Sequence, residues 1–345
     1  MEKTDIKSMT LSELSQEMRK LALPAYRAGQ IYKWLHVRGA FSFDEMSDLS
    51  KDLRARLDEE YIIRTCEIER RQESKQNETV KYLFRLYDGE HIESVLMKYK
   101  YGYTLCVSTQ VGCRMGCRFC ASTLAGFVRH LSASEILGQI HAAQRDCGIR
   151  VSHVVLMGMG EPLDNYDNVM RFLELVSDEN GLNIGMRNIS LSTCGIVPKI
   201  YELMEKKLQL TLSISIHAPN DEIRSKIMPI NKKYPMSELL EACRQYAKQT
   251  GRRISFEYTM IDGVNDSVEC AKELSRRLRG ILSHVNLIPA NEFSESPFSR
   301  SRAETIEKFV NEMKNNSVNV TLRRSLGSDI DASCGQLRLR NQKGG

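Results

Sequence analysis

The sequence predicts an α/β protein in which a parallel sheet forms the main domain and a small helical module precedes it. From about residue 101 onward, short apolar strands alternate with helical stretches, which is the pattern of a parallel sheet. The first 62 residues instead carry helix signals, with apolar residues at helical spacing. A chain of 345 residues, 41% hydrophobic and 27% charged, is long enough for one large domain and a smaller one.

Two groups of elements are expected before the main domain. Residues 1–62 form the helical module, in which Thr10 and Glu13 make a capping box at the start of the first helix. Residues 63–100 alternate polar and apolar side chains in the manner of strands, and Asp88-Gly89 supplies a hairpin turn between two of them. We therefore expect connecting β-strands between the module and the main domain.

Six strand–helix units follow in residues 101–290. The strands are expected at Thr104–Ser108, His153–Met157, Ile189–Thr193, Leu210–Ile216, Ile254–Met260 and His284–Ile288. The helices between them are expected near 132–146, 166–178, 197–206, 236–249 and 266–279. Such a sheet is either doubly wound or curled into a partial barrel, and in both cases ligands bind at the carboxyl ends of the strands. Residues 291–345 form a C-terminal extension with a helix near 303–314 and a strand at Val318–Leu322.

The composition limits the compartment and the role of the cysteines. No apolar run approaches the roughly 20 residues that cross a bilayer. The sequence starts with acidic residues and no apolar signal region, which predicts a cytoplasmic protein without membrane contact. The ten cysteines are therefore expected to be buried small side chains, metal ligands or catalytic thiols rather than a disulfide framework.

Three cysteines lie within eight residues directly after the first strand of the main domain. Cys113, Cys117 and Cys120 have the spacing C-x3-C-x2-C, and such soft thiolates bind iron–sulfur clusters or zinc. A structural zinc site needs four ligands, commonly in two separated pairs, and no fourth ligand follows at that spacing. An iron–sulfur cluster held by three thiolates leaves one iron open for a substrate or cofactor, so the loop favours a cluster.

The cysteine loop, with Phe119 before its last cysteine and a parallel strand–helix architecture around it, resembles the radical SAM enzymes. This resemblance implies a partial (β/α)6 barrel, a 4Fe-4S cluster on Cys113, Cys117 and Cys120, and S-adenosylmethionine (SAM) bound at the open iron. Reductive cleavage of SAM then gives a 5′-deoxyadenosyl radical, which reacts at carbon atoms that no side-chain base can activate.

Further stretches are similar to the RlmN/Cfr family of radical SAM RNA methyltransferases, and together they cover nearly the whole chain. They include Gly158–Pro162, Leu191–Gly195, Ser213–Asn220, and the segments around Cys106 and Cys334. The resemblance implies that SAM is bound by Gly160, Glu161, Ser192, Ser215, Ile216, His217 and Asn291. Read singly, a histidine such as His217 is more often structural than a ligand, and Gly160 fits an ordinary turn equally well.

The family chemistry gives roles to two cysteines and a carboxylate outside the loop. Carbon 2 of adenine is electrophilic, so a SAM methyl group cannot be transferred to it directly. The resemblance implies that Cys334 is first methylated to S-methylcysteine and that a second SAM per turnover generates the radical on this methyl group. Cys106 would then resolve the covalent RNA adduct through a transient disulfide with Cys334, and Glu93 would be the proton acceptor. Without the resemblance, we would interpret Cys106 as a core cysteine and Glu93 as a solvated surface glutamate.

The family resemblance also sets the partners and the alternatives. It implies 23S rRNA as substrate, tRNA as a second substrate, flavodoxin or ferredoxin as electron donor, and a monomer. The helical module would bind RNA phosphates through Arg19, Lys20, Arg27 and Lys33. The sequence favours the branch that methylates adenine carbon 2 over the Cfr type, which methylates carbon 8 of the same adenosine. A hypothesis from another class is a non-catalytic RNA-binding protein with a structural metal.

Overall fold

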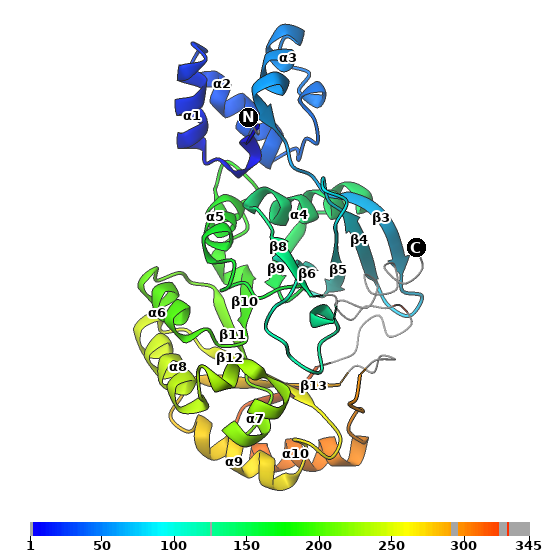
Figure 1. The fold of residues 1–345 in the computed structure, drawn as a ribbon, viewed down its shortest axis with the longest axis vertical. Helices are drawn as coiled ribbons and strands as arrows, with labels where there is room; N and C mark the ends of the chain where they lie inside the picture. Colours follow the sequence, from blue (N-terminus) through cyan, green and yellow to red (C-terminus); the bar gives the residue numbers. More distant parts are fainter. Residues whose placement is uncertain (1–2, 125, 291–295, 324–329, 331–345) are drawn as a thin grey trace.

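The computed structural model describes residues 3–124, 126–290, 296–323 and 330. The helical module lies at one end of the elongated molecule (Figure 1). It consists of α1 (Leu11–Lys20), α2 (Tyr26–His36) and α3 (Lys51–Glu60), with β1 (Thr4–Asp5) paired in parallel with β2 (Tyr61–Ile62). The capping box predicted at Thr10 and Glu13 is present at the start of α1, because each side chain satisfies a backbone N–H group that the first helical turn leaves free.

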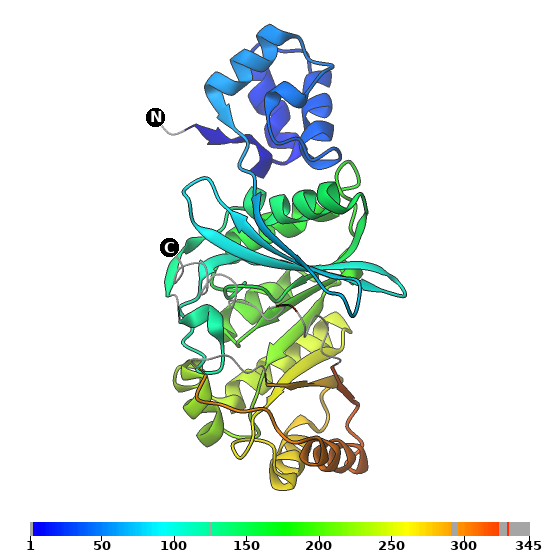
Figure 2. The same cartoon turned by 90° about the vertical axis from the view of Figure 1, so that its right-hand side faces the viewer.

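One ten-stranded sheet runs through the rest of the described chain. Its antiparallel part is β3 (Glu67–Glu73), β4 (Thr79–Arg85) and β5 (His91–Tyr99). Its parallel part is β6 (Gly102–Cys106), β9 (Val151–Leu156), β10 (Ile189–Thr193), β11 (Thr211–Ser215), β12 (Ile254–Met260), β13 (Ser283–Pro289) and β14 (Val320–Leu322). The strand order is β14-β13-β12-β11-β10-β9-β6-β5-β4-β3. Figure 2 shows the antiparallel strands between the helical module and the parallel strands.

Helices follow the parallel strands in alternation. They are α4 (Ala133–Cys147), α5 (Tyr166–Ser177), α6 (Val197–Glu205), α7 (Asp221–Ile227), α8 (Met236–Thr250), α9 (Val268–Leu278) and α10 (Ala303–Asn315). Along β11, Leu212 and Ile214 are completely buried, whereas Ser215 lines a cavity. A doubly wound sheet has helices on both faces, but here one face is apolar and the other carries polar groups around a cavity. The fold is therefore the partial barrel that the family resemblance implied.

The observed elements agree closely with the sequence pattern. β10 and β12 have the predicted bounds, and the other four strands of the six units shift by one or two residues at their ends. The sequence did not predict α7, nor the pair β7 (Gln110–Gly112) and β8 (Phe127–His130), which brackets the cysteine loop. β14 pairs in parallel with β13 and so extends the same sheet. Among the described helices, none has the length and apolar character of a membrane span.

Buried ionisable groups lie where the helical module meets α4. His36 is 1% exposed, and both its ring nitrogens lack a hydrogen-bond partner among the described residues. Its carbonyl group lies 3.2 Å from the Nε2 atom of His141 on α4. Burial, with a smaller contribution from the nearby Lys7 cation, lowers the pKa of His36 to about 3. Burial also lowers the pKa of Lys7 to about 8. The imidazole of His36 is therefore neutral at physiological pH.

We expect the junction to make the protein sensitive to acid. The pKa of His36 lies below its ordinary value of 6.5 in the folded chain, so the unfolded chain binds a proton that the folded chain excludes. Stability must then fall as the pH drops below 6.5, and the loss grows until about pH 3. His36→Leu should show a smaller decrease in unfolding temperature between pH 7.5 and pH 5. Equal decreases in the two proteins would contradict this assignment.

Candidate active site

The cysteine loop is held in place by backbone contacts on both of its sides. The hydroxyl of Thr123 donates to the carbonyl groups of Cys117, at 3.1 Å, and Cys120, at 2.8 Å. The N–H group of Arg118 donates to the carbonyl group of Ile227 at the end of α7, at 2.9 Å. These bonds fix the loop between the short helix that follows it and the rim of the barrel.

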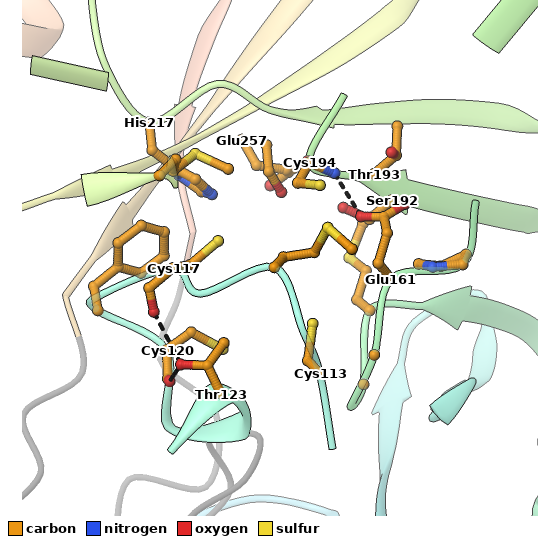
Figure 3. A pocket seen from close by; sticks show the side chains of 18 of the residues that line it. Cys113, Cys117, Cys120, Thr123, Glu161, Ser192, Thr193, Cys194, His217 and Glu257 are labelled. Carbon is orange, nitrogen blue, oxygen red and sulfur yellow. Dashed lines mark hydrogen bonds between the residues drawn. The ribbon is translucent and has the colours of Figure 1, made fainter. Parts of the chain in front are cut away.

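A cavity of about 210 Å³ separates this loop from the carboxyl ends of the parallel strands. Figure 3 shows the three cysteines on one side of it, with side chains of the strand ends across from them. The residues that line the cavity include Cys113, Cys117, Cys120, Gly160, Glu161, Ser192, Cys194, Ser215, His217 and Glu257. The structure thus brings together three predicted cluster ligands and five of the seven predicted SAM-binding residues.

Gly160 sits where no side chain fits. Its φ angle is +102°, in the region that favours glycine. A Cβ atom at this position would lie 2.6 Å from the Cβ atom of Gln110. The side chain of Gln110 in turn accepts a hydrogen bond from the N–H group of Glu161 at 2.8 Å. The glycine therefore allows the strand end to approach the base of the cysteine loop and sets the position of Glu161.

Glu161 is buried at the centre of the rim, with 4% of its surface exposed. Its carboxylate accepts hydrogen bonds from the N–H groups of Cys194, at 2.7 Å, and Leu163, at 3.0 Å. Burial raises the pKa of Glu161, and these hydrogen bonds oppose the rise. Glu161 also lines the cavity, where a carboxylate attracts an ammonium group.

His217 has a fixed protonation state and orientation. The N–H group of Thr259 donates to its Nδ1 atom at 2.9 Å, which leaves Nε2 as the protonated nitrogen. Burial, helped by the charge of Arg224, lowers the pKa of His217 to about 3. The imidazole is therefore neutral at physiological pH. The edge of Phe119, from the cysteine loop, packs on its ring at a centroid distance of 4.8 Å.

The remaining predicted SAM-binding residues have different positions. Ser192 and Ser215 line the cavity from the ends of β10 and β11. Ile216 is completely buried and is not part of the lining. Its N–H group donates to the Glu257 carbonyl group, and its own carbonyl group accepts from Arg224. Asn291 lies outside the described residues.

The predicted resolving thiol and proton acceptor lie on the sheet beside the cavity rather than in its lining. Cys106 is buried against Val95 and Met157, and Met157 also lines the cavity. Glu93 is 2% exposed and forms an ion pair with Lys81 at 2.6 Å, so the interpretation of Glu93 as a solvated residue is wrong. The predicted methyl carrier, Cys334, lies outside the described residues.

The cysteine loop suits an iron–sulfur cluster better than a single metal ion. Within the described ranges, no three His, Cys, Asp or Glu side chains are placed to hold one ion, as zinc would require. A cluster instead takes each thiolate on a different iron. Burial raises the pKa of Cys113 to about 12 and that of Cys117 well above its ordinary value. Such thiols become thiolates only where bound metal supplies positive charge, so the donor set fits a cluster that Cys113, Cys117 and Cys120 would hold.

Three residues of this region were not singled out in the sequence. Glu257 lines the cavity and accepts a hydrogen bond from Ser255 at 2.9 Å; its signal was a charged side chain within an otherwise apolar strand. Arg224 and Lys81 are both completely buried. They gave no local signal, because their partners lie on other elements.

Comparison with known proteins gives the class first. Residues 107–274 match the model of the radical SAM superfamily, and residues 4–63 match that of the ribosomal RNA large subunit methyltransferase N-terminal domain. A crystal structure of a radical SAM methyltransferase from Sphaerobacter thermophilus superposes with a TM-score of 0.93 and 44% sequence identity. That match covers 96% of this chain and 98% of the other. The fold is that of a radical SAM methyltransferase.

Full-length relatives then give the family. A probable dual-specificity RNA methyltransferase RlmN from Lachnoclostridium phytofermentans is 53% identical, over 98% of this chain and 95% of its own length. One from Lachnospira eligens is 54% identical, over 97% of this chain and 96% of its own. The chain belongs to the RlmN family of radical SAM RNA methyltransferases. Membership implies a 4Fe-4S cluster and SAM as cofactors and RNA as substrate.

A side chain at residue 160 should disturb SAM binding while leaving the cluster in place. In Gly160→Ala, the new Cβ atom must displace Gln110 and with it Glu161. Loss of about 1.4 kcal/mol would weaken SAM binding by roughly tenfold. Equilibrium binding of SAM and the iron content of the reconstituted protein measure the two effects.

Gly251→Ala is the matched control, because residue 251 has a φ angle of +67° but no atoms near the added Cβ. This variant should lose about 1 kcal/mol of stability through backbone strain and bind SAM normally. Normal SAM binding by Gly160→Ala would remove Gly160 and Glu161 from the proposed cofactor site.

Proposed function

We propose that this protein methylates carbon 2 of an adenosine in 23S rRNA, and of the adenosine next to the anticodon in tRNAs, through an S-methylcysteine on Cys334. The observation that carries the proposal is the placement of the cysteine loop opposite Glu161, Ser192 and His217 across one cavity. It occurs in a chain that is more than half identical to RlmN proteins over almost its whole length.

The residues of the cavity have complementary tasks in this proposal. When bound, the cluster and SAM supply a methyl cation for the thiolate of Cys334 and, from a second SAM, a radical that takes a hydrogen atom from the S-methyl group. Glu161 accepts from the ammonium group of SAM, and neutral His217 offers its Nε2–H group as a donor. The hydroxyl groups of Ser192 and Ser215 face the same space, where they position polar groups of SAM. Gly160, Ile216 and Asn291 complete the proposed set.

Resolution of the RNA adduct uses the sheet beside the cavity. Glu93 takes the proton from carbon 2 of the radical adduct, and the electron pair of this C–H bond stays in the ring. The one unpaired electron left by radical addition would return to the oxidised cluster that supplied it, so that the adduct becomes closed-shell. The Cys106 thiolate then attacks the sulfur of Cys334 and forms a disulfide. The electron pair of the broken C–S bond remains on the methyl carbon, which takes up a proton. Cys106 and Glu93 lie on the adjacent strands β6 and β5, whose register pairs Cys106 with Val95, two residues from Glu93.

RNA binding and electron supply remain predictions. The target adenosine must leave its stack to reach a buried cavity. We propose that the helical module, whose residues match a ribosomal RNA methyltransferase domain, holds the surrounding RNA. Flavodoxin or ferredoxin is the proposed electron donor, and we propose that the protein acts as a monomer in the cytoplasm.

The decisive experiment uses anaerobically reconstituted protein with SAM, dithionite and protein-free 23S rRNA. We expect 5′-deoxyadenosine and RNA that carries 2-methyladenosine, identified by mass spectrometry of nucleosides. 8-Methyladenosine would instead assign the Cfr-type reaction. Absence of 5′-deoxyadenosine, with one tightly bound zinc ion, would assign the non-catalytic alternative.

Cys334→Ala should abolish methylated RNA while leaving the iron content and absorption spectrum of the cluster unchanged, because the proposed methyl carrier is separate from the cluster ligands. Cys270→Ala is the control, since Cys270 lies on α9, away from the cavity lining. Methylation by Cys334→Ala at the rate of the unaltered protein would refute its role.

Phosphate contacts of the helical module should make RNA binding sensitive to salt. Arg19 and Lys33 are exposed on α1 and α2. Arg19→Gln and Lys33→Gln should each weaken binding and reduce the slope of log K against log salt by about 0.7–0.9. Lys248→Gln on α8, also exposed, should change neither quantity. Unchanged slopes in both module variants would place the RNA elsewhere.

A further inference from the structure

The antiparallel part of the sheet contains a completely buried ion pair whose lysine has no role in the proposed reaction. The ammonium group of Lys81 on β4 lies 2.6 Å from the carboxylate of Glu93 on β5, and the two side chains are 0% and 1% exposed. Moving two charges out of water costs more free energy than an ion pair on the surface contributes. Proteins with apolar side chains of similar size in place of such a buried pair are often at least as stable. As a purely structural contact, this pair would therefore be unfavourable for the free energy of folding.

The strand register places this pair on the same face as the resolving thiol. Lys81 is paired with Val95, and Val95 with Cys106, across β4, β5 and β6 (Figure 1). Directly opposed residues on neighbouring strands project to the same face, so these three side chains form one row. Glu93 is two residues from Val95 and shares its face.

The opposite face of β5 belongs to the outer helical layer. Ser94 donates a hydrogen bond to the side chain of Gln139 on α4 at 2.6 Å. The same side-chain oxygen of Gln139 accepts from the N–H group of Ser108 at 2.8 Å. Glu93, next to Ser94, therefore points away from α4 and toward the inner side of the barrel. Its backbone is fixed as well, because the hydroxyl of Ser108 donates to the Glu93 carbonyl group at 2.6 Å.

We propose that Lys81 is a positioning residue for the resolution step, in which it keeps Glu93 ionised and oriented beside Cys106. This inference rests on the proposed role of Glu93 as proton acceptor. A buried carboxylate without a cation tends to be neutral, and a neutral carboxyl group cannot accept the carbon 2 proton. With Lys81 in place, the carboxylate is charged before the RNA adduct forms. After proton transfer, the ammonium group lies beside a neutral acid and favours the release of the proton for the next turnover.

The proposal separates the two halves of the reaction. Radical formation uses the cysteine loop and the cavity, so Lys81→Met should still form 5′-deoxyadenosine and the covalent RNA adduct. Resolution should then be slow, and the adduct should accumulate as a protein–RNA band on denaturing gels, at least tenfold above the level in the unaltered protein. Lys81→Arg keeps the cation and should restore most of the release of methylated RNA.

The chain offers a matched control at one end of the same two strands, where Lys98 lies on β5 and Glu78 directly precedes β4. Lys98 and Glu78 form an ion pair at 2.5 Å whose side chains are 42% and 68% exposed. Lys98→Met removes the same kind of contact from the solvated end of the sheet and should leave adduct level and product release unchanged.

Folding of the variants is measured separately, because Lys81→Met leaves an unpaired buried carboxylate, which is strongly destabilising. The double variant Lys81→Met/Glu93→Gln removes both charges and should recover the unfolding temperature and iron content while still accumulating adduct. If it folds and releases methylated RNA at the rate of the unaltered protein, the proposal is wrong. The same holds if Lys81→Met folds and fails to form 5′-deoxyadenosine, because Lys81 would then act before resolution.

Glu93→Gln distinguishes failure of this inference from failure of the proposed function. If Glu93→Gln alone releases methylated RNA normally, Glu93 is not the proton acceptor, and the assignment of Lys81 fails with it. If Glu93→Gln accumulates adduct and Lys81→Met does not, the role of Glu93 stands and only the role of Lys81 is overturned.

Discussion

The buried guanidinium group of Arg224 is the interaction on which the geometry of the site depends. It is completely buried and donates to the carbonyl groups of Cys194, Ser215 and Ile216 at 2.7, 3.2 and 3.1 Å. These carbonyl groups lie at or just beyond the ends of β10 and β11. At these positions the strand pairing has ended, so the carbonyl groups need other hydrogen-bond donors. A buried charged group is tolerated only when its N–H donors have hydrogen-bond acceptors. The contacts that supply these acceptors to Arg224 therefore also fix the rim. Through α7, which carries Arg224 and accepts from the cysteine loop, the loop and the rim become one unit.

The electrostatics of this unit explain why cofactors belong in it. Cys113, Cys117, Glu161 and Glu257 surround one small cavity, and burial raises the pKa of both thiols and of Glu161. The positive charge of Arg224 offsets part of the rise in the pKa of Cys117. Iron ions and the sulfonium and ammonium groups of SAM bring positive charge to the place where the protein has gathered acids. Because such ligands bind the folded chain and not the unfolded one, they also stabilise the fold.

Sequence reasoning succeeded where function follows from local pattern. The bounds of β10 and β12 were predicted to the residue, since apolar strands bounded by turn residues carry a periodic signal. The cysteine loop was likewise found from its spacing, whereas Glu161 and His217 were proposed as SAM-binding residues from the family resemblance; all of them line one cavity. Arg224 and Lys81 could not be found in this way, because their roles come from partners on other elements. Glu93 alone would pass for a surface residue, and only the pairing of β4 with β5 shows that it is buried.

The antiparallel strands bring side chains to the inner face of the barrel that its six strand–helix units cannot place there. The parallel strands present their last side chains to the rim, where the cysteine loop and the proposed SAM-binding residues line the cavity. β5 runs in the opposite direction beside β6, so it brings Glu93 and Val95 to the inner face at the level where β6 ends in Cys106. The proposed base and the proposed resolving thiol therefore lie beside the cavity without forming part of its lining. In the proposed reaction, the position of these two sets of groups on one sheet lets different residues make and release the adduct.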